Sequence, residues 1–496
     1  AHADASWQPW SHPLDDSLAP YYRWFVDGQT NACFNLIDRH VLSGRGDQIA
    51  IIFEGDRWDP SKNDGRGGPV HEQRVTYREL LVEVALRTRV LKQADLSCGD
   101  RVALNLPNVL EQIFYILACQ RLGVIYTPVF GGFSAKTLSD RIHDAGAKVV
   151  ITADGGYRNA EVVPYKSTYT DPALDNYIPR PAALEALSAT LRTRLSADVA
   201  ERLEAQVSEA IAGEITLERA DVMRELGLAL ERERGTAPEV IAELRTTVAS
   251  ELANVGHAVT HVIVIRYTGN DIVEHARDFW SPDLVAQVET DLLADAGVAD
   301  RAALYALDDT ALWQAVGPHA AAVPVEANWP LFIIYTSGST GKPKGVVHTH
   351  GGWLSGITHT LRTVFNANQD DCLYVIGDPG WITGQSYLIA APLAFGMSTM
   401  IAEGSPLFPH AGRFASIIER NNVTIFKAGS TFLKAVMTDP ASTQEMSRYD
   451  MSSLKVGTFC AEPVSPTVQQ FAMDNICSHY INSYWATEHG GIVFSC

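Results

Sequence analysis

The chain has 496 residues, 46% of them hydrophobic, so it is long enough for about three domains and can bury a sizeable core. Its 39 basic and 58 acidic side chains give a net charge of −19 without a long Lys or Arg block, which excludes nucleic acid and anionic membrane surfaces as main partners. No apolar run approaches the ~18 residues of a membrane span, and seven scattered cysteines form no C-x-x-C pair. We therefore expect a soluble protein of the reducing cytoplasm.

Between residues 74 and 154, helical patterns alternate with short apolar runs such as RVALNLP and GVIYTPV. This rhythm is typical of βα units and predicts a mostly parallel, doubly wound sheet. The alternation stops near Tyr177. Residues 182–256 are rich in Ala, Glu, Leu and Arg and are interrupted at Gly213 and at GTAP, which predicts three or four helices. We interpret them as an insertion that buries one face on the body; the alternative is a module that docks a partner.

Strand signals return at HAVTHVIVIRY, which begins at His257, and strand and helix patterns then alternate to the end of the chain. A second α/β unit therefore follows the first. The predicted organisation is an N-terminal extension (1–73), a first α/β subdomain (74–176), a helical insertion (177–256) and a second α/β subdomain (257–496).

The stretch YTSGSTGKPKG, residues 335–345, follows an apolar strand and is dense in hydroxyls, glycines and lysines. Glycines let backbone N–H groups approach an anion, and the Ser, Thr and Lys side chains add donors and positive charge, so the stretch predicts a phosphate-binding loop. It is not a P-loop of the G-x-x-x-x-G-K-[ST] type, because Thr336 replaces the first glycine and Pro343 replaces the final hydroxyl residue.

The segment YTSGSTGKPKGVVHTHGG resembles the signature loop of the AMP-forming acyl-CoA synthetases, which belong to the adenylate-forming superfamily. GDPGWITGQSY, CAEPVSP and YWATEHGG resemble three further motifs of its acetyl- and propionyl-CoA synthetase branch, in the same order. The resemblance covers nearly the whole chain except residues 177–255. It implies the large N-terminal domain of that fold: two doubly wound α/β subdomains and a small β-barrel-like part, here with the helical insertion.

The resemblance implies a two-step ligation that uses ATP, Mg²⁺ and coenzyme A to convert a small carboxylate through acyl-AMP into a thioester. Thr336, Lys342, Thr487 and Glu488 would be catalytic, with Glu488 placing the metal. ATP and AMP would be bound by Thr336, Ser337, Gly338, Ser339, Thr340, Gly341, Lys342, Ala461, Glu462, Pro463, Asn482, Ser483, Tyr484, Trp485 and Thr487. Tyr484 would stack on adenine, and the Asn482 amide stands where this branch usually has Asp.

In the short-chain branch a tryptophan closes the acyl pocket, and Trp485 matches that position, which implies an acid of two or three carbons. The pocket would also contain Trp381, Ile382, Thr383 and Cys460. Coenzyme A would contact Gly131, Gly132, Phe133 and Arg158. Glu161 replaces a second arginine of the branch, which weakens the expected contact with the coenzyme's 3′-phosphate. The pair His348 and His350 is interpreted as structural, with no metal assigned.

Members of the superfamily end in a mobile C-terminal lid domain that carries the lysine of the adenylation step, and we expect this domain to be absent here. The chain would then bind its ligands but turn over poorly. The insertion, the GQTNACFNLIDRHVLSGRGD segment and Asn482 resemble the ligase part of propionyl-CoA synthase, which implies 3-hydroxypropionate as the acid and fused dehydratase and reductase domains as partners. Two alternatives remain open: a fragment of a stand-alone acetyl- or propionyl-CoA synthetase, and a non-catalytic nucleotide-binding scaffold.

Overall fold

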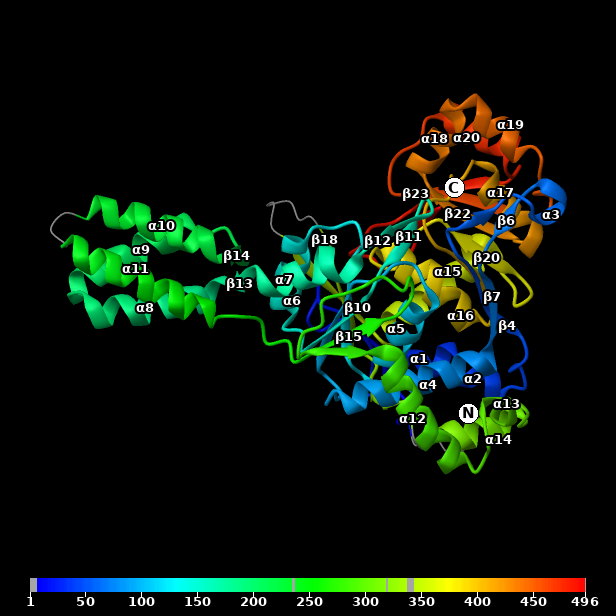
Figure 1. Cartoon of the computed structure of the whole chain (residues 1–496). Coiled ribbons are helices and arrows are strands. Elements are labelled where there is room, and N and C mark those ends of the chain that lie inside the picture. Colours follow the sequence, from blue (N-terminus) through cyan, green and yellow to red (C-terminus); the bar gives the residue numbers. More distant parts are fainter. Residues whose placement is uncertain (1–6, 234–236, 318–319, 337–342, 496) are drawn as a thin grey trace.

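Two large β-sheets form the body of the protein (Figure 1). The computed structural model describes residues 7–233, 237–317, 320–336 and 343–495. The first sheet has seven strands in the order β16-β15-β10-β8-β9-β18-β19, all parallel except β19. In that order the strands are Asp278–Trp280, His261–Ile265, Val149–Ala153, Arg101–Leu104, Ile125–Pro128, Pro330–Thr336 and Lys344–Thr349.

The second sheet has eight strands in the order β25-β24-β23-β22-β20-β21-β4-β7, with an antiparallel strand at each edge. In that order they are Phe494–Ser495, Tyr480–Tyr484, Val456–Cys460, Ile425–Gly429, Cys372–Val375, Ser398–Ala402, Ile49–Glu54 and Glu72–Thr76. The inner strands are apolar and buried, as expected for parallel strands that are covered on both faces.

Helices cover both faces of each sheet and give the body five layers. The central layer packs between the sheets, where one continuous apolar core joins them; it contains α4 (Tyr77–Gln93), α5 (Leu110–Leu122), α15 (Gly352–Phe365), η2 (Gly384–Ala390) and α16 (Ala391–Phe395). The outer face of the second sheet packs on α17 (Gly412–Asn421), α18 (Ser430–Thr438), α19 (Pro440–Met446) and α20 (Pro466–Asn475). The outer face of the first packs on α6 (Ala135–Ala145) and α7 (Asp171–Asp175).

Smaller elements connect these layers. The helical ones are α1 (Ala32–Leu36), α2 (Asp38–Leu42), α3 (Lys62–Gly65), η1 (Lys166–Thr170), α12 (Ser281–Ala296), α13 (Arg301–Tyr305) and α14 (Asp309–Val316).

Local sequence fixes where the long helices begin and end. Thr76 and Glu79 form a reciprocal capping box at the start of α4, and α5 ends at Gly123, whose φ of 69° is left-handed.

The sheets divide the chain differently from the predicted domain boundaries. Residues 257–349, placed with the second subdomain, contribute four strands to the first sheet. Conversely, β4 and β7 from the N-terminal part pair at the edge of the second sheet. The hydrophobic pattern of a strand predicts that it pairs, but not with which partner, so the α/β class was predictable and the sheet membership was not.

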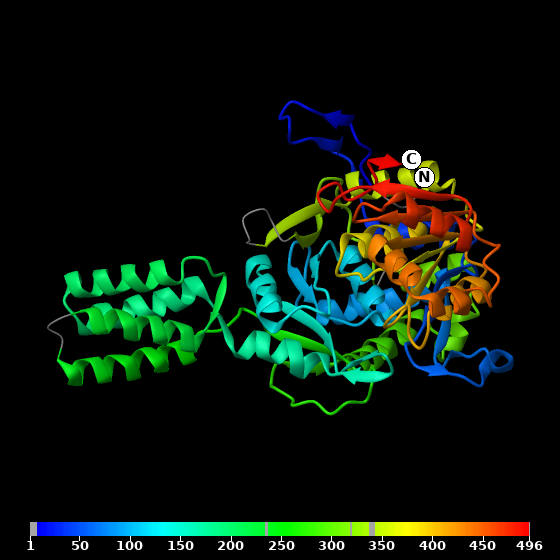
Figure 2. The same cartoon turned by 90° about the horizontal axis from the view of Figure 1, so that it is seen from above.

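The helical insertion is a separate four-helix bundle that stands apart from the body (Figures 1 and 2). Its helices are α8 (Arg180–Arg194), α9 (Ala197–Ala210), α10 (Arg219–Arg232) and α11 (Pro238–Ala253), joined to the body through the ribbon of β13 (Tyr177–Pro179) and β14 (Thr216–Glu218). We call this unit the arm. Its apolar residues form their own core, so the expectation that it buries one face on the body is wrong: each helix turns its apolar stripe into a core that the four helices share.

We expect the arm to be removable. The two ends of the arm lie close together, because the Arg219 guanidinium donates to the backbone oxygens of both Asp175 and Val255. Replacing residues 177–255 by a short Gly-Ser linker should leave the body folded, since the body loses little apolar burial. Scanning calorimetry should retain a body transition within a few degrees of the parent. A chain that no longer folds would contradict the independence of the two cores.

The remaining strands pair as two-stranded ribbons, and no barrel-like part occurs among the residues that the structure describes. These strands are β1 (His12–Asp15), β2 (Arg23–Val26), β3 (Gln29–Thr30), β5 (Trp58–Asp59), β6 (Gly68–Pro69), β11 (Gly156–Arg158), β12 (Glu161–Val163) and β17 (Val325–Glu326). Within the same described ranges, no helix is both long and apolar enough to span a bilayer.

Candidate active site

The predicted phosphate loop connects β18 and β19, the antiparallel pair at the edge of the first sheet. Thr336 closes β18 opposite Lys344, and the Tyr335 hydroxyl donates to Asp144 Oδ2 at 2.6 Å, which ties the strand end to α6. The remaining predicted loop residues lie outside the described residues; they are Ser337, Gly338, Ser339, Thr340, Gly341 and Lys342.

The hairpin that carries this loop contacts the segment after β24. His348 of β19 places Nε2 2.9 Å from the Thr487 backbone oxygen, and burial lowers the pKa of His348 to about 4, so a neutral imidazole donates this bond. Gly490 packs against His348 and Trp353 with a φ of 72°, where a side chain would be both strained and obstructed. Glu488 is exposed beside Thr487. The structure therefore brings the β18–β19 hairpin, which we call the phosphate hairpin after its predicted loop, close to the Thr487–Glu488 segment.

The predicted adenosine residues lie where neighbouring parallel strands end. Ala461 follows β23 with a φ of 79°, and Pro463 follows in the same turn. The Glu462 carboxylate accepts from Ser430 and Lys434 of α18. On the adjacent strand β24, Tyr484 exposes 58% of its surface, and Asn482 pairs in register with Phe459. The carboxyl edge of a parallel sheet is where α/β proteins bind ligands.

The predicted acyl-pocket residues fall into two groups. Cys460 and Trp485 are buried on β23 and just after β24, and the Trp485 ring meets Tyr387 edge to face at 5.2 Å. Ile382 is also buried, with Thr383 beside it at the start of η2. Trp381 is instead 45% exposed and packs on Phe130 at 5.7 Å.

Trp381 lines a cavity of about 380 Å³ together with the predicted coenzyme A residues Gly131, Gly132 and Arg158. Phe133 supports its wall by packing on the Trp381 ring at 5.5 Å. Glu161 lies directly opposite Arg158 in the β11–β12 ribbon, so an acidic side chain accompanies the arginine where the resemblance implied a second arginine.

Sequence reasoning missed Asp378, a carboxyl in the wall of this cavity. It accepts from the Gly380 N–H at 2.7 Å, and burial raises its pKa to about 7. The GDPG turn could have drawn attention to it, because an acid between glycines after a buried strand is a common site residue.

We expect Asp378→Asn to stabilise the protein at high pH. The folded-state pKa lies above the ordinary 3.8, so the unfolded chain loses this proton first as the pH rises, and the free energy of unfolding falls between about pH 4 and pH 7. The substitution removes that loss and should gain on the order of 4 kcal/mol over the parent at pH 8, with little gain at pH 4. Urea unfolding at both pH values measures the difference in the free energy of unfolding between variant and parent. The same gain at pH 4 and at pH 8 would contradict the raised pKa.

A second missed residue is Lys427, in the middle of β22. Its side chain is fully buried on the face of the sheet that carries Cys460. A lysine inside the apolar run TIFKAG is the sequence signal that could have found it, because lysine is almost never fully buried without a partner.

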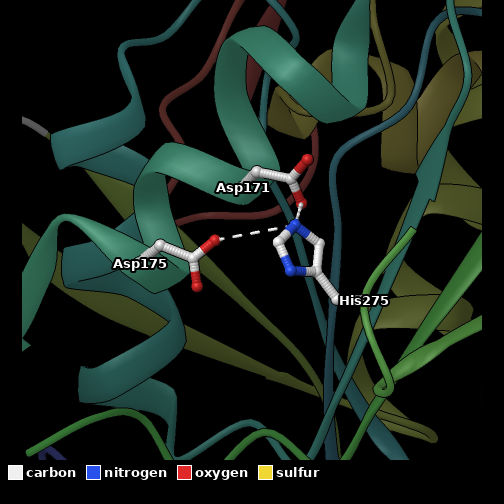
Figure 3. A group of neighbouring side chains, drawn as sticks. All are labelled: Asp171, Asp175 and His275. Atoms are coloured by element: carbon white, nitrogen blue, oxygen red, sulfur yellow. Dashed lines mark ion pairs between the residues drawn. The ribbon is translucent and has the colours of Figure 1, made fainter. Parts of the chain in front are cut away.

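A carboxylate cluster occurs at the root of the arm, away from these groups. Asp171 and Asp175 place oxygens 3.8 and 3.9 Å from His275 Nε2 (Figure 3). The same carboxylates already pair with cations: Lys166 lies 2.8 Å from Asp171, and Arg277 lies 2.8 Å from Asp175. The carboxylates are thus already paired with cations of the body, and we assign no metal to this cluster.

The strand ends of the second sheet meet the β18–β19 hairpin of the first, an arrangement typical of ligand sites in α/β proteins. The chain belongs to the AMP-binding enzyme family, whose model matches residues 39–496. Residues 3–36 match a second model, the acetyl-coenzyme A synthetase N-terminus.

Curated relatives include acetyl-coenzyme A synthetases of three bacteria. The Herminiimonas arsenicoxydans protein is 32% identical over 98% of this chain and 57% of its own length. The Methylobacillus flagellatus protein is 33% identical over 99% of this chain and 57% of its own length. The Methylorubrum populi protein is 33% identical over 98% of this chain and 58% of its own length. The chain thus spans a little over half the length of the relatives it matches.

Proposed function

We propose that the chain is a short-chain acyl-CoA ligase module, which joins a carboxylate to the α-phosphate of ATP and then passes the acyl group to coenzyme A. The observation that carries the proposal is the contact between His348 and Thr487, which unites the phosphate hairpin with the strand ends of the second sheet. Membership of the AMP-binding family and the names of the relatives support it.

In this proposal the protein positions two anions against each other. The loop from Thr336 to Lys342 holds the β- and γ-phosphates, Thr487 contacts the α-phosphate, and Tyr484 offers an exposed ring to adenine. Glu488 fits a magnesium site, because an exposed carboxylate beside the hairpin supplies the hard oxygen ligand that this ion prefers. Bound Mg²⁺ would neutralise phosphate charge, while the protein groups supply orientation and exclude water.

We propose a short acid, with Trp485 closing the acyl pocket. The burial of Trp485 against Tyr387 supports this proposal. We extend the proposal to 3-hydroxypropionate, in an enzyme that also carries dehydratase and reductase domains. The resemblance to propionyl-CoA synthase supports this extension.

The test is calorimetric titration with AMP esters that mimic acyl-AMP and carry propyl, 3-hydroxypropyl or octyl groups. We expect the two short esters to bind and the octyl ester to fail. Binding of none would overturn the ligase proposal in favour of the scaffold, and equal binding of octyl would overturn the short-chain assignment.

Glu488→Gln separates the magnesium role from nucleotide binding. We expect Mg²⁺-dependent ATP binding to weaken about tenfold or more, because a neutral amide lacks the charge that attracts the ion. Affinity for the propyl ester, which lacks the β- and γ-phosphates, should change less than twofold. Glu419→Gln on α17 is the control, and equal weakening for ATP with and without Mg²⁺ would contradict the assignment.

A further inference from the structure

Lys427 is a buried cation for which the proposed reaction has no role. Its exposed fraction is 0%, and its Nζ lies 5.3 Å from the Tyr387 ring centroid, 5.6 Å from Trp485 and 6.0 Å from Phe365. Its one oxygen partner among the described residues is Ser483 Oγ, at 2.7 Å. Burial lowers the pKa of Lys427, and the neighbouring Cys460 side chain opposes that shift.

The surrounding side chains do not accept hydrogen bonds from all of the ammonium's N–H groups. An ammonium carries three N–H donors. Ser483 Oγ accepts one of them, also receives the Thr458 hydroxyl at 2.9 Å, and itself donates to the Phe459 carbonyl at 2.9 Å. No carboxylate lies within ion-pair distance of Lys427 in the described ranges. The Cys460 side chain is a second hydrogen-bond partner of the ammonium. Three aromatic rings, a hydroxyl and this sulfur surround the charge, and at least one N–H donor is left for a ligand.

The strand register places this ammonium below the proposed acyl pocket, on the same face of the sheet. Lys427 of β22 pairs with Thr458 of β23. Cys460 lies two residues after Thr458 on β23, so the side chains of Lys427, Thr458 and Cys460 point to the same face of the sheet. Ser483 and Trp485 have the same two-residue relation after β24. In register across the three strands, Lys427 is level with Thr458 and Ile481, and Cys460 is level with Ser483. Lys427 therefore lies one row of side chains, roughly 7 Å, below the Cys460 of the proposed pocket wall.

We propose that Lys427 is a specificity-determining residue that binds an oxygen at the far end of the acyl group. This inference rests on the proposed ligase function and refines its substrate to short acids with a distal hydroxyl or carboxylate. The distal oxygen accepts a hydrogen bond from the Lys427 ammonium, and Ser483 holds the ammonium in place. Such a site disfavours propionate, because binding it would leave the desolvated ammonium without that acceptor.

The experiment compares AMP esters that carry propyl, 3-hydroxypropyl and 2-carboxyethyl groups. We expect at least one oxygen-bearing ester to bind the parent roughly tenfold to a hundredfold more tightly than propyl, as for hydrogen bonds to a charged group. The preferred ester then identifies a hydroxy acid or a dicarboxylic acid as the source. Equal binding of all three would overturn the inference and leave the ligase proposal standing, whereas binding of none would overturn both.

Variants separate recognition from structural support. Lys427→Met keeps the volume and should bring the three affinities to within about twofold of one another, by weakening the oxygen-bearing esters and leaving the propyl ester at least as tightly bound as in the parent. Lys427→Gln keeps a neutral donor and should retain part of any preference for hydroxypropyl but none for carboxyethyl. Lys148→Met, at an exposed ion pair with Asp100, is the control. If Lys427→Met weakened all three esters equally, Lys427 would be a structural residue and the proposal would fail.

The melting temperature of Lys427→Met tests whether Lys427 has a structural role instead. Replacing a buried, unneutralised charge by an apolar side chain of similar volume is often stabilising, so the melting temperature of Lys427→Met should equal or exceed that of the parent. A large fall would show that the ammonium stabilises the empty protein, which would contradict its assignment to a ligand.

Discussion

Trp485→Gly is expected to bind the octyl ester of AMP at least a hundredfold more tightly than the parent does. The indole is buried and meets Tyr387 edge to face. In the proposed acyl pocket it would block a longer acyl chain. Removing it leaves a cavity large enough for several methylenes, each of which contributes roughly 0.8 kcal/mol when buried. The octyl group carries five methylenes more than propyl, so even partial burial is sufficient for the expected gain.

The matched control is Trp381→Gly. The resemblance assigned both tryptophans to the acyl pocket, but Trp381 is half exposed and packs on Phe130 in the cavity of Arg158. Trp381→Gly should therefore give no gain for the octyl ester. A gain there, or none for Trp485→Gly, would contradict the placement of the pocket wall. Calorimetric titration of both variants measures the effect, and circular dichroism checks their folding, because loss of a buried Trp costs about 3–5 kcal/mol.

The sequence was sufficient to predict the α/β class and the helices of the arm, because each depends on local pattern. The phosphate loop stays a prediction, since residues 337–342 lie outside the described residues. Periodicity identifies βα units within a few dozen residues, and the donors of residues 336–344 are adjacent in the chain. The arm was visible for the same reason, although its separate core was not: an amphipathic helix does not specify which surface covers its apolar stripe.

What the sequence could not predict depends on contacts between distant strands. Lys427 reaches Ser483 only because β22, β23 and β24 are neighbours, a pairing that spans 56 residues. Asp378 has a raised pKa only because the fold buries it beside the cavity wall. The motif assigned Trp381 and Trp485 one shared role, and only the packing of their rings separates them.

Arg413→Met is expected to lower the free energy of unfolding by about 3–5 kcal/mol, the usual cost of removing one partner from a buried ion pair. The Arg413 side chain on α17 is fully buried, with Nε 3.1 Å from Glu54 Oε1 and a terminal nitrogen 3.3 Å from Asp56 Oδ1. Its remaining N–H groups donate to the backbone oxygens of Gly55 and Ser405, each at 3.1 Å. The substitution therefore leaves two buried carboxylates without this partner, and Arg420 compensates only Glu54.

Arg66→Met provides the control, because Arg66 lies outside α17 and pairs with Glu419 of that helix at the surface. Its loss should cost less than about 1 kcal/mol. Urea unfolding of both variants measures the difference. Arg413 also ties β4 to the turn at Ser405, which lines the cavity of Arg158 and Asp378, so its loss should loosen that cavity wall as well. If both variants lost the same small amount of stability, the buried network would contribute no more than a surface pair, and solvent would have to reach Glu54 and Asp56.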